Sequence, residues 1–220
     1  MKMSLSDRMK AHEQRFNSTV FDNLPCVVRV DGRTFSSFTR GFDKPYDDRF
    51  ITCMLETAKY VTSQAPCIVA YVQSDEISYV FYEENYKSDL WFSGRAQKLS
   101  SVLASMTTAS FCRKIDIHLK CRRGSVPNFD GRTFGLPGES ELFNYLLWRE
   151  QDAFKNHVNL ISQQYYSSKQ LNNKSIDERQ EMLFQKHGIN VKTDFTEHKR
   201  RGSYIKNGEI LDIGVDRISQ

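Results

Sequence analysis

The sequence predicts an α+β fold whose elements follow the order β-α-β-β-α-β, with a helical extension at the C-terminal end. Two observations predict this order. Short apolar runs rich in β-branched residues alternate with segments whose apolar residues recur at the i, i+3, i+4 and i+7 positions of a helix. After residue 135 the patterns become mainly helical. We therefore expect an antiparallel-rich sheet that helices cover on one face.

The first strand and the first helix follow from local composition. Pro25–Val30 is apolar and β-branched, which is typical of a short buried strand, and this run ends at Asp31-Gly32. A polar loop follows, and Asp47 or Asp48 is placed to cap a helix. One apolar face of this helix is formed by Ile51, Met54, Leu55 and Ala58.

The next two strands form a hairpin in this interpretation. Cys67–Val72 and Ile77–Tyr82 are apolar runs of strand length, and the four residues between them, Gln73–Glu76, are polar. A tight hairpin is the simplest geometry for two strands joined by so short a turn. A second helix comes after the hairpin, with an apolar face formed by Leu99, Val102, Leu103 and Met106.

A fourth strand would complete a ferredoxin-like arrangement, and two segments are candidates for it, Ile115–Leu119 and Val126–Phe134. The second candidate contains a short repeat. The pentapeptide Asp-Gly-Arg-Thr-Phe occurs at residues 31–35 and again at 130–134. Because nothing around the two copies matches, we do not interpret them as a duplication, and we expect the second copy to be structural.

The C-terminal part is predicted to be helical. Glu139 to about Gln164 has a helical pattern, and Asn172–Ser175 is a polar break. Ser175 and Glu178 make a capping box for a last helix that ends near His187-Gly188. In the tail, Tyr204–Ile213 contains Asn207-Gly208 between apolar residues, a pattern that favours a hairpin.

The bulk composition excludes several classes of protein. Hydrophobic residues make up 39% and charged residues 26% of the 220 residues, as in folded globular proteins. The formal net charge of +4 permits an anionic partner without demonstrating one. No apolar run reaches the roughly 20 residues of a membrane helix, and Met1–Arg15 lacks the apolar centre of a secretory signal. We expect a cytoplasmic protein that does not associate with membranes. The five cysteines form no C-x-x-C pair, so a zinc site is not expected.

Carboxylates follow two separate strands of the predicted sheet. Asp31 comes where the first strand runs out, and Asp75 and Glu76 lie in the hairpin turn. Carboxylate side chains that meet at one edge of the sheet repel one another unless cations neutralise their charge. Mg²⁺ suits such a site because it prefers hard oxygen ligands and binds substrate phosphates at the same time. Two such ions can stabilise a phosphoryl displacement, and Gly32 lets a backbone carbonyl approach an ion. The alternative is a pair of ordinary polar turns.

Basic residues near these carboxylates would be needed to hold a triphosphate. The candidates are Arg29, Arg33, Arg40, Lys44, Arg95 and Lys98. Arg29 lies inside a strand, where an unpaired charge is costly, so we expect it to face an acidic group or a phosphate. Two further basic clusters, Lys120–Arg123 and Lys199–Arg201, either contact RNA phosphates or are solvated surface.

Five blocks of the sequence resemble the tRNA-histidine guanylyltransferase family. They keep the order of that family and span about residues 10–165. The blocks are Val28–Phe35, Phe42–Pro45 with Asp47, Gln73–Ser78 with Val80 and Phe81, Phe129–Arg132, and Tyr145–Asp152. The family consists of 3′-to-5′ RNA polymerases with a palm-like catalytic domain. The resemblance therefore implies a ferredoxin-like palm in residues 1–135, and we expect residues 136–220 to be a helical extension with a small hairpin in one continuous globular unit.

The resemblance also implies roles for individual residues. Asp31, the backbone of Gly32 and Asp75 would bind two Mg²⁺ ions, with Glu76 beside them as the third catalytic residue. Lys44 and Ser74 match positions suited to nucleotide phosphates, and Asp47 follows in the same loop. Our candidates for RNA contacts are Arg132, Asn156, Lys199, Arg200 and Arg201. The implied partners are a tRNA with a damaged or truncated 5′ end, ATP and GTP, and the implied assembly is a homotetramer.

Two departures from the family pattern bear on the reaction. Where the histidine-adding enzymes carry a histidine after the first motif, this sequence has Ser36, and Phe154 replaces a second motif histidine, although Asn156 matches. The sequence is therefore more similar to the like-protein branch, which repairs truncated tRNA by copying the opposite strand. Guanylyl addition to tRNA-histidine and a non-catalytic nucleotide- or RNA-binding module are the alternatives.

Overall fold

The computed structural model describes residues 3–20, 23–82 and 89–211, and in them a six-stranded sheet has the order β4-β1-β3-β2-β5-β6. Every strand pairing in this sheet is antiparallel. The strands are β1 (Cys26–Gly32), β2 (Val69–Gln73), β3 (Glu76–Phe81), β4 (Phe129–Gly135), β5 (Ser203–Lys206) and β6 (Glu209–Leu211). The first four strands, with the helices between them, confirm the predicted β-α-β-β-α-β order and the α+β fold.

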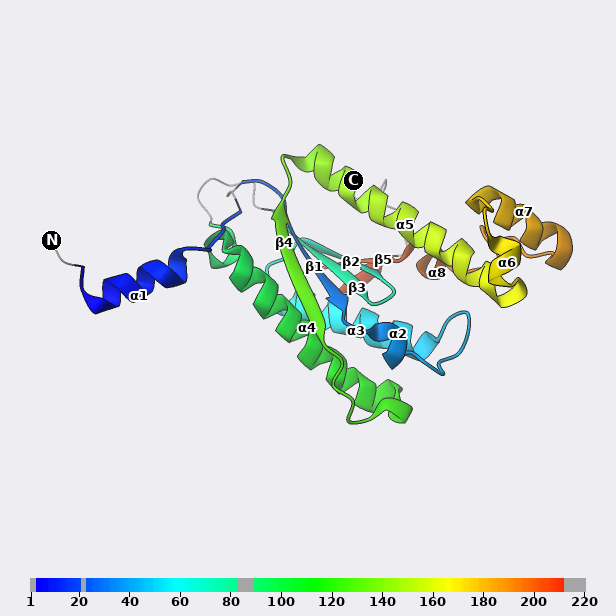
Figure 1. Ribbon diagram of the computed structural model, residues 1–220, viewed down its shortest axis with the longest axis horizontal. Helices are drawn as coiled ribbons and strands as arrows, with labels where there is room; N and C mark the ends of the chain where they lie inside the picture. Colours follow the sequence, from blue (N-terminus) through cyan, green and yellow to red (C-terminus); the bar gives the residue numbers. More distant parts are fainter. Residues whose placement is uncertain (1–2, 21–22, 83–88, 212–220) are drawn as a thin grey trace.

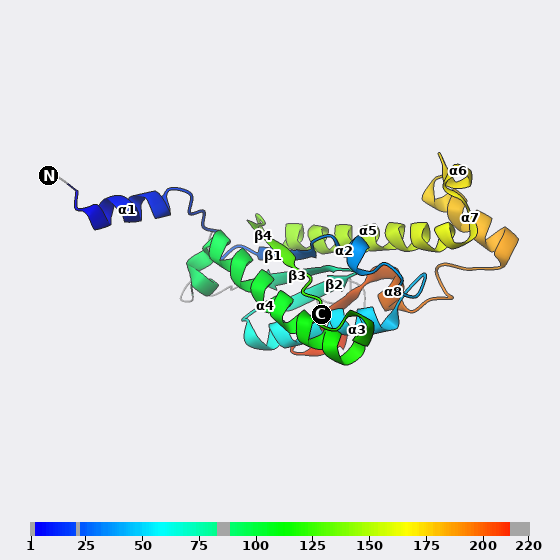
Figure 2. The same cartoon turned by 60° about the horizontal axis from the view of Figure 1, so that its bottom comes forward.

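Helices lie on both faces of this sheet and, for α1, α6 and α7, beyond it (Figures 1 and 2). They are α1 (Leu5–Gln14), α2 (Phe35–Phe38), α3 (Asp48–Gln64), α4 (Ala96–His118), α5 (Glu139–Tyr165), α6 (Ser168–Leu171), α7 (Ile176–His187) and α8 (Glu197–Arg201), with 3₁₀ turns η1 (Trp91–Gly94) and η2 (Lys120–Arg122). Helices α3 and α4 cover one face, and α5 crosses the other.

The prediction that only one face is covered was wrong. Val27 and Val80 of the central strands pack with Tyr145 and Leu146 of α5, whereas Val28 belongs to the core on the α3 and α4 side. Successive strand residues point to opposite faces, so an apolar pair such as Val27-Val28 requires burial on both.

The predicted boundaries hold with small changes. Asp47 caps α3 by accepting from the backbone N–H groups of Arg49 and Phe50. Strand β1 extends through Gly32, and the hairpin turn shortens to Ser74-Asp75. Of the two candidates for the fourth strand, Ile115–Leu119 ends α4 and the segment containing Phe129–Gly135 forms β4.

The C-terminal part contributes to the same sheet. The capping box of Ser175 and Glu178 is present, and Gly188 ends α7 in the left-handed conformation at φ 66°. Asn207 and Gly208, both with positive φ, form the predicted hairpin turn, although residues 212 and 213 of the predicted segment lie outside the described residues. Strand β5 pairs with β2 and β6 pairs with β5, so these two strands extend the sheet. The division at residue 135 stays a prediction.

Several short helices were not predicted. Helix α1 has no buried residue and projects from the body of the molecule (Figure 1). Its N-cap is Ser4, whose side chain accepts from the backbone N–H of Asp7. Helices α2, α6 and α8 span only one turn or slightly more, which is too short for a periodic pattern to show. Among the described helices, none is long and apolar enough to span a membrane.

Candidate active site

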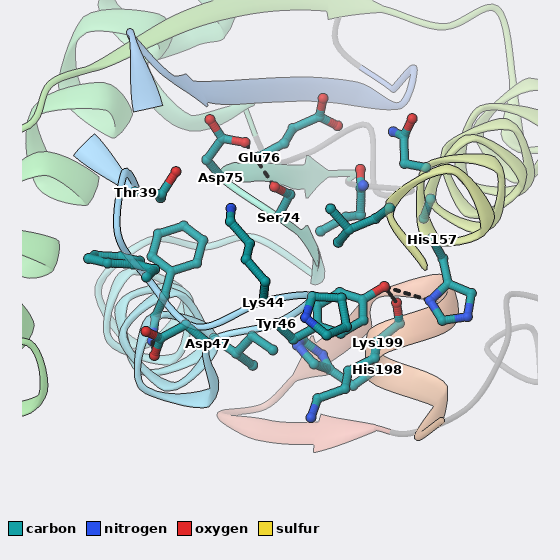
Figure 3. A pocket seen from close by; sticks show the side chains of 18 of the residues that line it. Thr39, Lys44, Tyr46, Asp47, Ser74, Asp75, Glu76, His157, His198 and Lys199 are labelled. Atoms are coloured by element: carbon teal, nitrogen blue, oxygen red, sulfur yellow. Dashed lines mark hydrogen bonds between the residues drawn. The ribbon is translucent and has the colours of Figure 1, made fainter. Parts of the chain in front are cut away.

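A cleft of about 420 Å³ opens where β1 and the β2–β3 turn face α5 (Figure 3). The loop that follows α2 and the start of α8 form its other walls. Residues that line it include Asp31, Lys44, Tyr46, Asp47, Ser74, Asp75, Glu76, Arg149, Asn156, His157 and Lys199. The cleft therefore combines acidic groups from the sheet edge with polar and basic groups from helices far away in the sequence.

Asp31 and Asp75 come together at one edge of the sheet. The backbone N–H of Gly32 donates to the carbonyl oxygen of Asp75 at 3.1 Å, which ties the end of β1 to the turn. Burial raises the pKa of the Asp75 carboxyl, and the neighbouring Asp31 carboxylate raises it further. Two carboxylates that disfavour each other's charge are a donor set suited to a divalent cation.

The chemistry of this donor set fits Mg²⁺. In the described part of the chain, no group of three or more His, Cys, Asp or Glu side chains is arranged to hold a metal ion. Mg²⁺ commonly takes only one or two protein carboxylates, with water and substrate phosphates completing its shell. Gly32 is also needed for packing, because a Cβ atom there would lie 2.4 Å from the Phe35 ring.

Glu76 is held by arginine. It pairs with Asp31 in the sheet register, and Arg149 of α5 binds it through two hydrogen bonds, Nε to Oε1 at 2.8 Å and Nη2 to Oε2 at 3.1 Å. The Arg29 Nε lies 3.9 Å from Glu76 Oε2, so Arg29 faces an acidic group as predicted. Burial raises the pKa of the Glu76 carboxyl, and both guanidinium groups oppose that shift.

Sequence reasoning missed Arg149 and its second partner, Asp152. The Arg149 Nη2 also donates to Asp152 Oδ2 at 3.2 Å, and the Asn156 side chain donates to the same oxygen at 3.4 Å. Arg149 is 6% exposed, and a buried arginine requires an anionic partner. Its position within the Tyr145–Asp152 block was the available signal, but nothing local identified Glu76 as its partner.

The residues predicted to bind phosphates divide into those that line the cleft and those that do not. Arg33 and Arg40 are exposed and do not line it, so the structure does not place them to hold a triphosphate there. Lys44 and Ser74 line the cleft, and the Lys44 side chain extends toward Ser74 and Asp75 (Figure 3). Arg95 and Lys98 lie near the start of α4, where Arg95 bridges to Thr19 at the opposite end of the sheet. The Lys98 ammonium lies over the Phe92 ring, 4.6 Å from its centre. The fold of one chain does not bring these two residues to the cleft.

Asp47 serves the local fold. The residue is 5% exposed, and its carboxylate accepts from the backbone N–H groups of Asp43, Arg49 and Phe50 as well as from the Arg49 guanidinium. The hydrogen bonds from Arg49 lower the pKa of Asp47 to about 2. These donors already occupy the carboxylate oxygens. The predicted contact of Asp47 with a nucleotide stays a prediction.

The basic residues of α8 are paired with acids. Lys199 Nζ lies 2.7 Å from Asp48 Oδ1. Arg200 pairs with Glu197, and Arg201 lies 3.8 Å from Glu150 and 3.5 Å from Glu197. Of the predicted RNA contacts, Asn156 and Lys199 line the cleft, whereas Arg132 is exposed on β4, 3.8 Å from Asp130.

The wall of the cleft remote from the carboxylates contains a buried polar chain that the sequence did not indicate. The Tyr46 hydroxyl lies 2.5 Å from His157 Nδ1 and 3.0 Å from the carbonyl oxygen of Lys199. His157 Nε2 lies 3.2 Å from the carbonyl oxygen of Val191, and burial lowers the pKa of this histidine. These contacts join the loop after α2, α5 and the segment before β5.

Comparison with known proteins decides the family. The family model described as tRNAHis guanylyltransferase matches residues 6–137, more than half of the chain. The chain belongs to the tRNA(His) guanylyltransferase family. It is therefore a nucleotidyltransferase, as the resemblance implied.

Relatives and solved structures of this family match most of the chain. It is 30% identical to the tRNA(His) guanylyltransferase of Neurospora crassa, with 100% of this chain and 78% of that protein covered. A bacterial tRNA(His) guanylyltransferase-like protein in complex with ATP superposes with a TM-score of 0.89 at 31% identity, covering 96% of this chain and 93% of that one. A complex of a bacterial like-protein with GTP superposes with a TM-score of 0.78, also at 31% identity, covering 93% of this chain and 84% of that one.

Proposed function

We propose that this nucleotidyltransferase repairs tRNA molecules with truncated 5′ ends by adding nucleotides in the 3′-to-5′ direction, with the opposite strand as template. The observation that carries the proposal is the convergence of Asp31 and Asp75 in one cleft with Lys44 and Ser74. A pair of carboxylates for metal ions and a cation for phosphate charge are the parts that phosphoryl transfer requires.

The reaction would proceed in two phosphoryl transfers at this one site. In the first, an oxygen of the RNA 5′-monophosphate attacks the α-phosphorus of ATP or GTP, which joins a nucleoside monophosphate to the RNA through a new phosphoanhydride bond and releases pyrophosphate. In the second, the 3′-hydroxyl of an incoming nucleotide attacks the activated 5′ end, and the activating group leaves. The known complexes of bacterial like-proteins with ATP and with GTP support both nucleotides as ligands.

Different residues of this chain would bind the metal ions, bind the phosphates and support the site. Asp31, Asp75 and the backbone of Gly32 would hold two Mg²⁺ ions, which supply charge stabilisation for the attacking and leaving oxygens. The Lys44 ammonium, which extends toward the Ser74–Asp75 turn, is placed to neutralise phosphate charge. Glu76 is already bound by Arg149, so it would support the strand ends that carry Asp31 and Asp75, and its predicted catalytic role stays a prediction.

The environment of Phe154 favours repair over guanylyl addition to tRNA-histidine. Phe154 packs against the apolar cluster formed by Val158, Ile161 and Leu183, with its ring 6.1 Å from that of His157. This partly buried phenyl group offers no hydrogen bond to a base, whereas template pairing selects the nucleotide without a hydrogen bond from the protein. Ser36 is exposed in α2 and does not line the cleft.

The decisive experiment uses four versions of one 5′-monophosphate tRNA that lack the first nucleotide and differ in the opposite base. Each is incubated with Mg²⁺ and with all four nucleoside triphosphates, and the added nucleotide is identified. Repair predicts the complement of the opposite base in all four cases. Addition of G in every case would establish the guanylyltransferase alternative, and no addition by the wild-type chain would leave the binding-module alternative.

Assembly and location complete the proposal. We expect a homotetramer, which light scattering of the purified chain would show as a mass four times 25.6 kDa. Five free cysteines are compatible with the cytoplasmic location that we propose.

A further inference from the structure

Two basic regions flank the cleft, and they differ in whether their charge is neutralised. In α8, each of Lys199, Arg200 and Arg201 has an acidic partner. On the other side of Asp31, four exposed cations have no ion-pair partner within residues 3–20, 23–82 and 89–211. These residues, Arg33, Arg40, Lys120 and Arg123, form what we call the α2–η2 surface.

Arg122 holds the two segments of the α2–η2 surface together. Its Nε donates to the carbonyl oxygen of Phe38 at 3.0 Å, and its Nη2 donates to the carbonyl oxygen of Arg40. Its guanidinium also lies 5.5 Å from the centre of the Phe42 ring. The backbone N–H of Arg33 donates to the carbonyl oxygen of Asn128 at 2.8 Å, a second link between the same segments. The four cations are therefore presented on a fixed backbone.

The α2–η2 surface adjoins the cleft along the chain. Arg33 follows Asp31 by two residues in the chain, and the loop that carries Arg40 continues to Lys44, which lines the cleft. In Figure 1, α2 and the C-terminal end of α4 lie on the same side of the molecule as the tip of the β2–β3 hairpin. A polyanionic strand on this surface would thus have its end beside the two carboxylates.

We propose that the α2–η2 surface binds the phosphate backbone of the RNA whose 5′ end enters the cleft, and that α8 does not. This inference rests on the proposed function, since it assumes an RNA substrate. Unpaired surface cations bind phosphates and release counterions, whereas cations already paired with carboxylates gain little from a second anion. Exposed lysine and arginine contacts of this kind position the strand without reading its sequence.

The test compares two triple variants that lose the same charge. The first is Arg40→Gln, Lys120→Gln and Arg123→Gln, and it spares Arg33 because of its closeness to Asp31. The matched control is Lys169→Gln, Lys192→Gln and Lys206→Gln, three exposed lysines elsewhere on the chain that also lack an ion-pair partner in its described part. Binding of the truncated 5′-monophosphate tRNA is measured by fluorescence anisotropy over a series of KCl concentrations, and ATP binding reports an intact fold and cleft.

The first variant should bind tRNA more weakly and with a shallower salt dependence. We apply the value for B-DNA to duplex RNA. Each lost phosphate contact then reduces the magnitude of the negative slope of log K against log salt by about 0.9, so three lost contacts reduce it by roughly 2 to 3. The control should change the slope by less than about 1, and both variants should bind ATP as the wild type does. Equal losses in the two variants, or none in the first, would overturn the inference while the proposed function stands. Failure of the wild-type chain to bind tRNA would overturn both, and would point to an acidic protein as the partner.

Discussion

The two copies of Asp-Gly-Arg-Thr-Phe meet in the sheet at their first residues, yet they do different things. β1 and β4 are antiparallel neighbours, and Asp31 of the first copy pairs with Asp130 of the second. Asp31 faces the cleft and lies close enough to Asp75 to influence its pKa. Asp130 is exposed and lies 3.8 Å from Arg132. Identical residues therefore acquire different roles from the elements that surround them.

The difference arises where each copy leaves the sheet. The first leaves after Gly32, so Thr34 takes the left-handed conformation and Phe35 begins α2 inside the core. The second stays in β4 for all five residues. Its glycine is required by α4, because a Cβ atom on Gly131 would lie 2.7 Å from the carbonyl oxygen of Ser100. Gly32 leaves room for the Phe35 ring, whereas Gly131 leaves room for α4.

The largest expected contrast is catalytic. Asp31→Ala should lower the rate of nucleotide incorporation by about a thousandfold or more, since it removes half of the carboxylate pair that would hold the metal ions. Asp130→Ala should leave the rate within about threefold, because Asp130 is exposed and does not line the cleft. Single-turnover incorporation at saturating Mg²⁺ measures both variants. If Asp130→Ala were as inactive as Asp31→Ala, the two copies would share one function and the comparison would fail.

The second contrast is in stability. Phe35 is 3% exposed and its ring packs against those of Phe38, Phe50, Phe111 and Phe129. Phe35→Ala should lower the free energy of unfolding by about 3–5 kcal/mol, the usual cost of truncating a fully buried phenylalanine.

Phe134 provides the comparison for that variant. It is only partly buried, against Tyr145 on the α5 side. Phe134→Ala should therefore cost roughly half as much, since less apolar area returns to water. Urea unfolding followed by circular dichroism gives both values, and equal losses would show that the two aromatic sites are equivalent in the folded protein.

The sequence predicted the first four strands of the sheet and the convergence of Asp31 and Asp75 because local strand and turn patterns indicate both. Strand-like runs, a four-residue polar turn and helical periodicity together place the ends of β1 and β3 at one edge. The partner of Glu76 was not predictable in this way. Arg149 is 73 residues further along the chain, and only the packing of α5 on the second face brings its guanidinium to Glu76. The missing information was therefore the position of α5.

The basic residues also show that tertiary contacts, which the sequence does not reveal, decide the state of surface side chains. Composition identified two similar clusters, Lys120–Arg123 and Lys199–Arg201, and gave no reason to prefer either. The fold separates them, since α8 carries its acidic partner Glu197 and meets Asp48 and Glu150. Arg122 instead folds onto the loop after α2, and its neighbours Lys120 and Arg123 have no ion-pair partner in the part of the chain that the structure describes. Net charge on a segment does not indicate charge available to a ligand until tertiary partners are known.

The smallest contrast has opposite signs in the two copies. Thr34 has φ 57° and ψ 30°, a left-handed conformation that costs a residue with a Cβ atom about 1–2 kcal/mol, while glycine loses about 0.5–1 kcal/mol of backbone entropy there. Thr34→Gly should therefore be neutral or raise the free energy of unfolding by up to about 1 kcal/mol.

Thr133 has the opposite expectation because it lies in extended β4, where its hydroxyl hydrogen-bonds to that of Ser100 at 2.7 Å. Thr133→Gly loses that bond, worth about 1 kcal/mol, and adds the entropy cost of glycine in a strand, so it should destabilise by about 1–2 kcal/mol. Thermal and urea unfolding of the two variants measure this difference directly. Destabilisation of both to the same extent would mean that the left-handed turn after Gly32 is not strained, and that the first copy differs from the second only in the groups that its side chains meet.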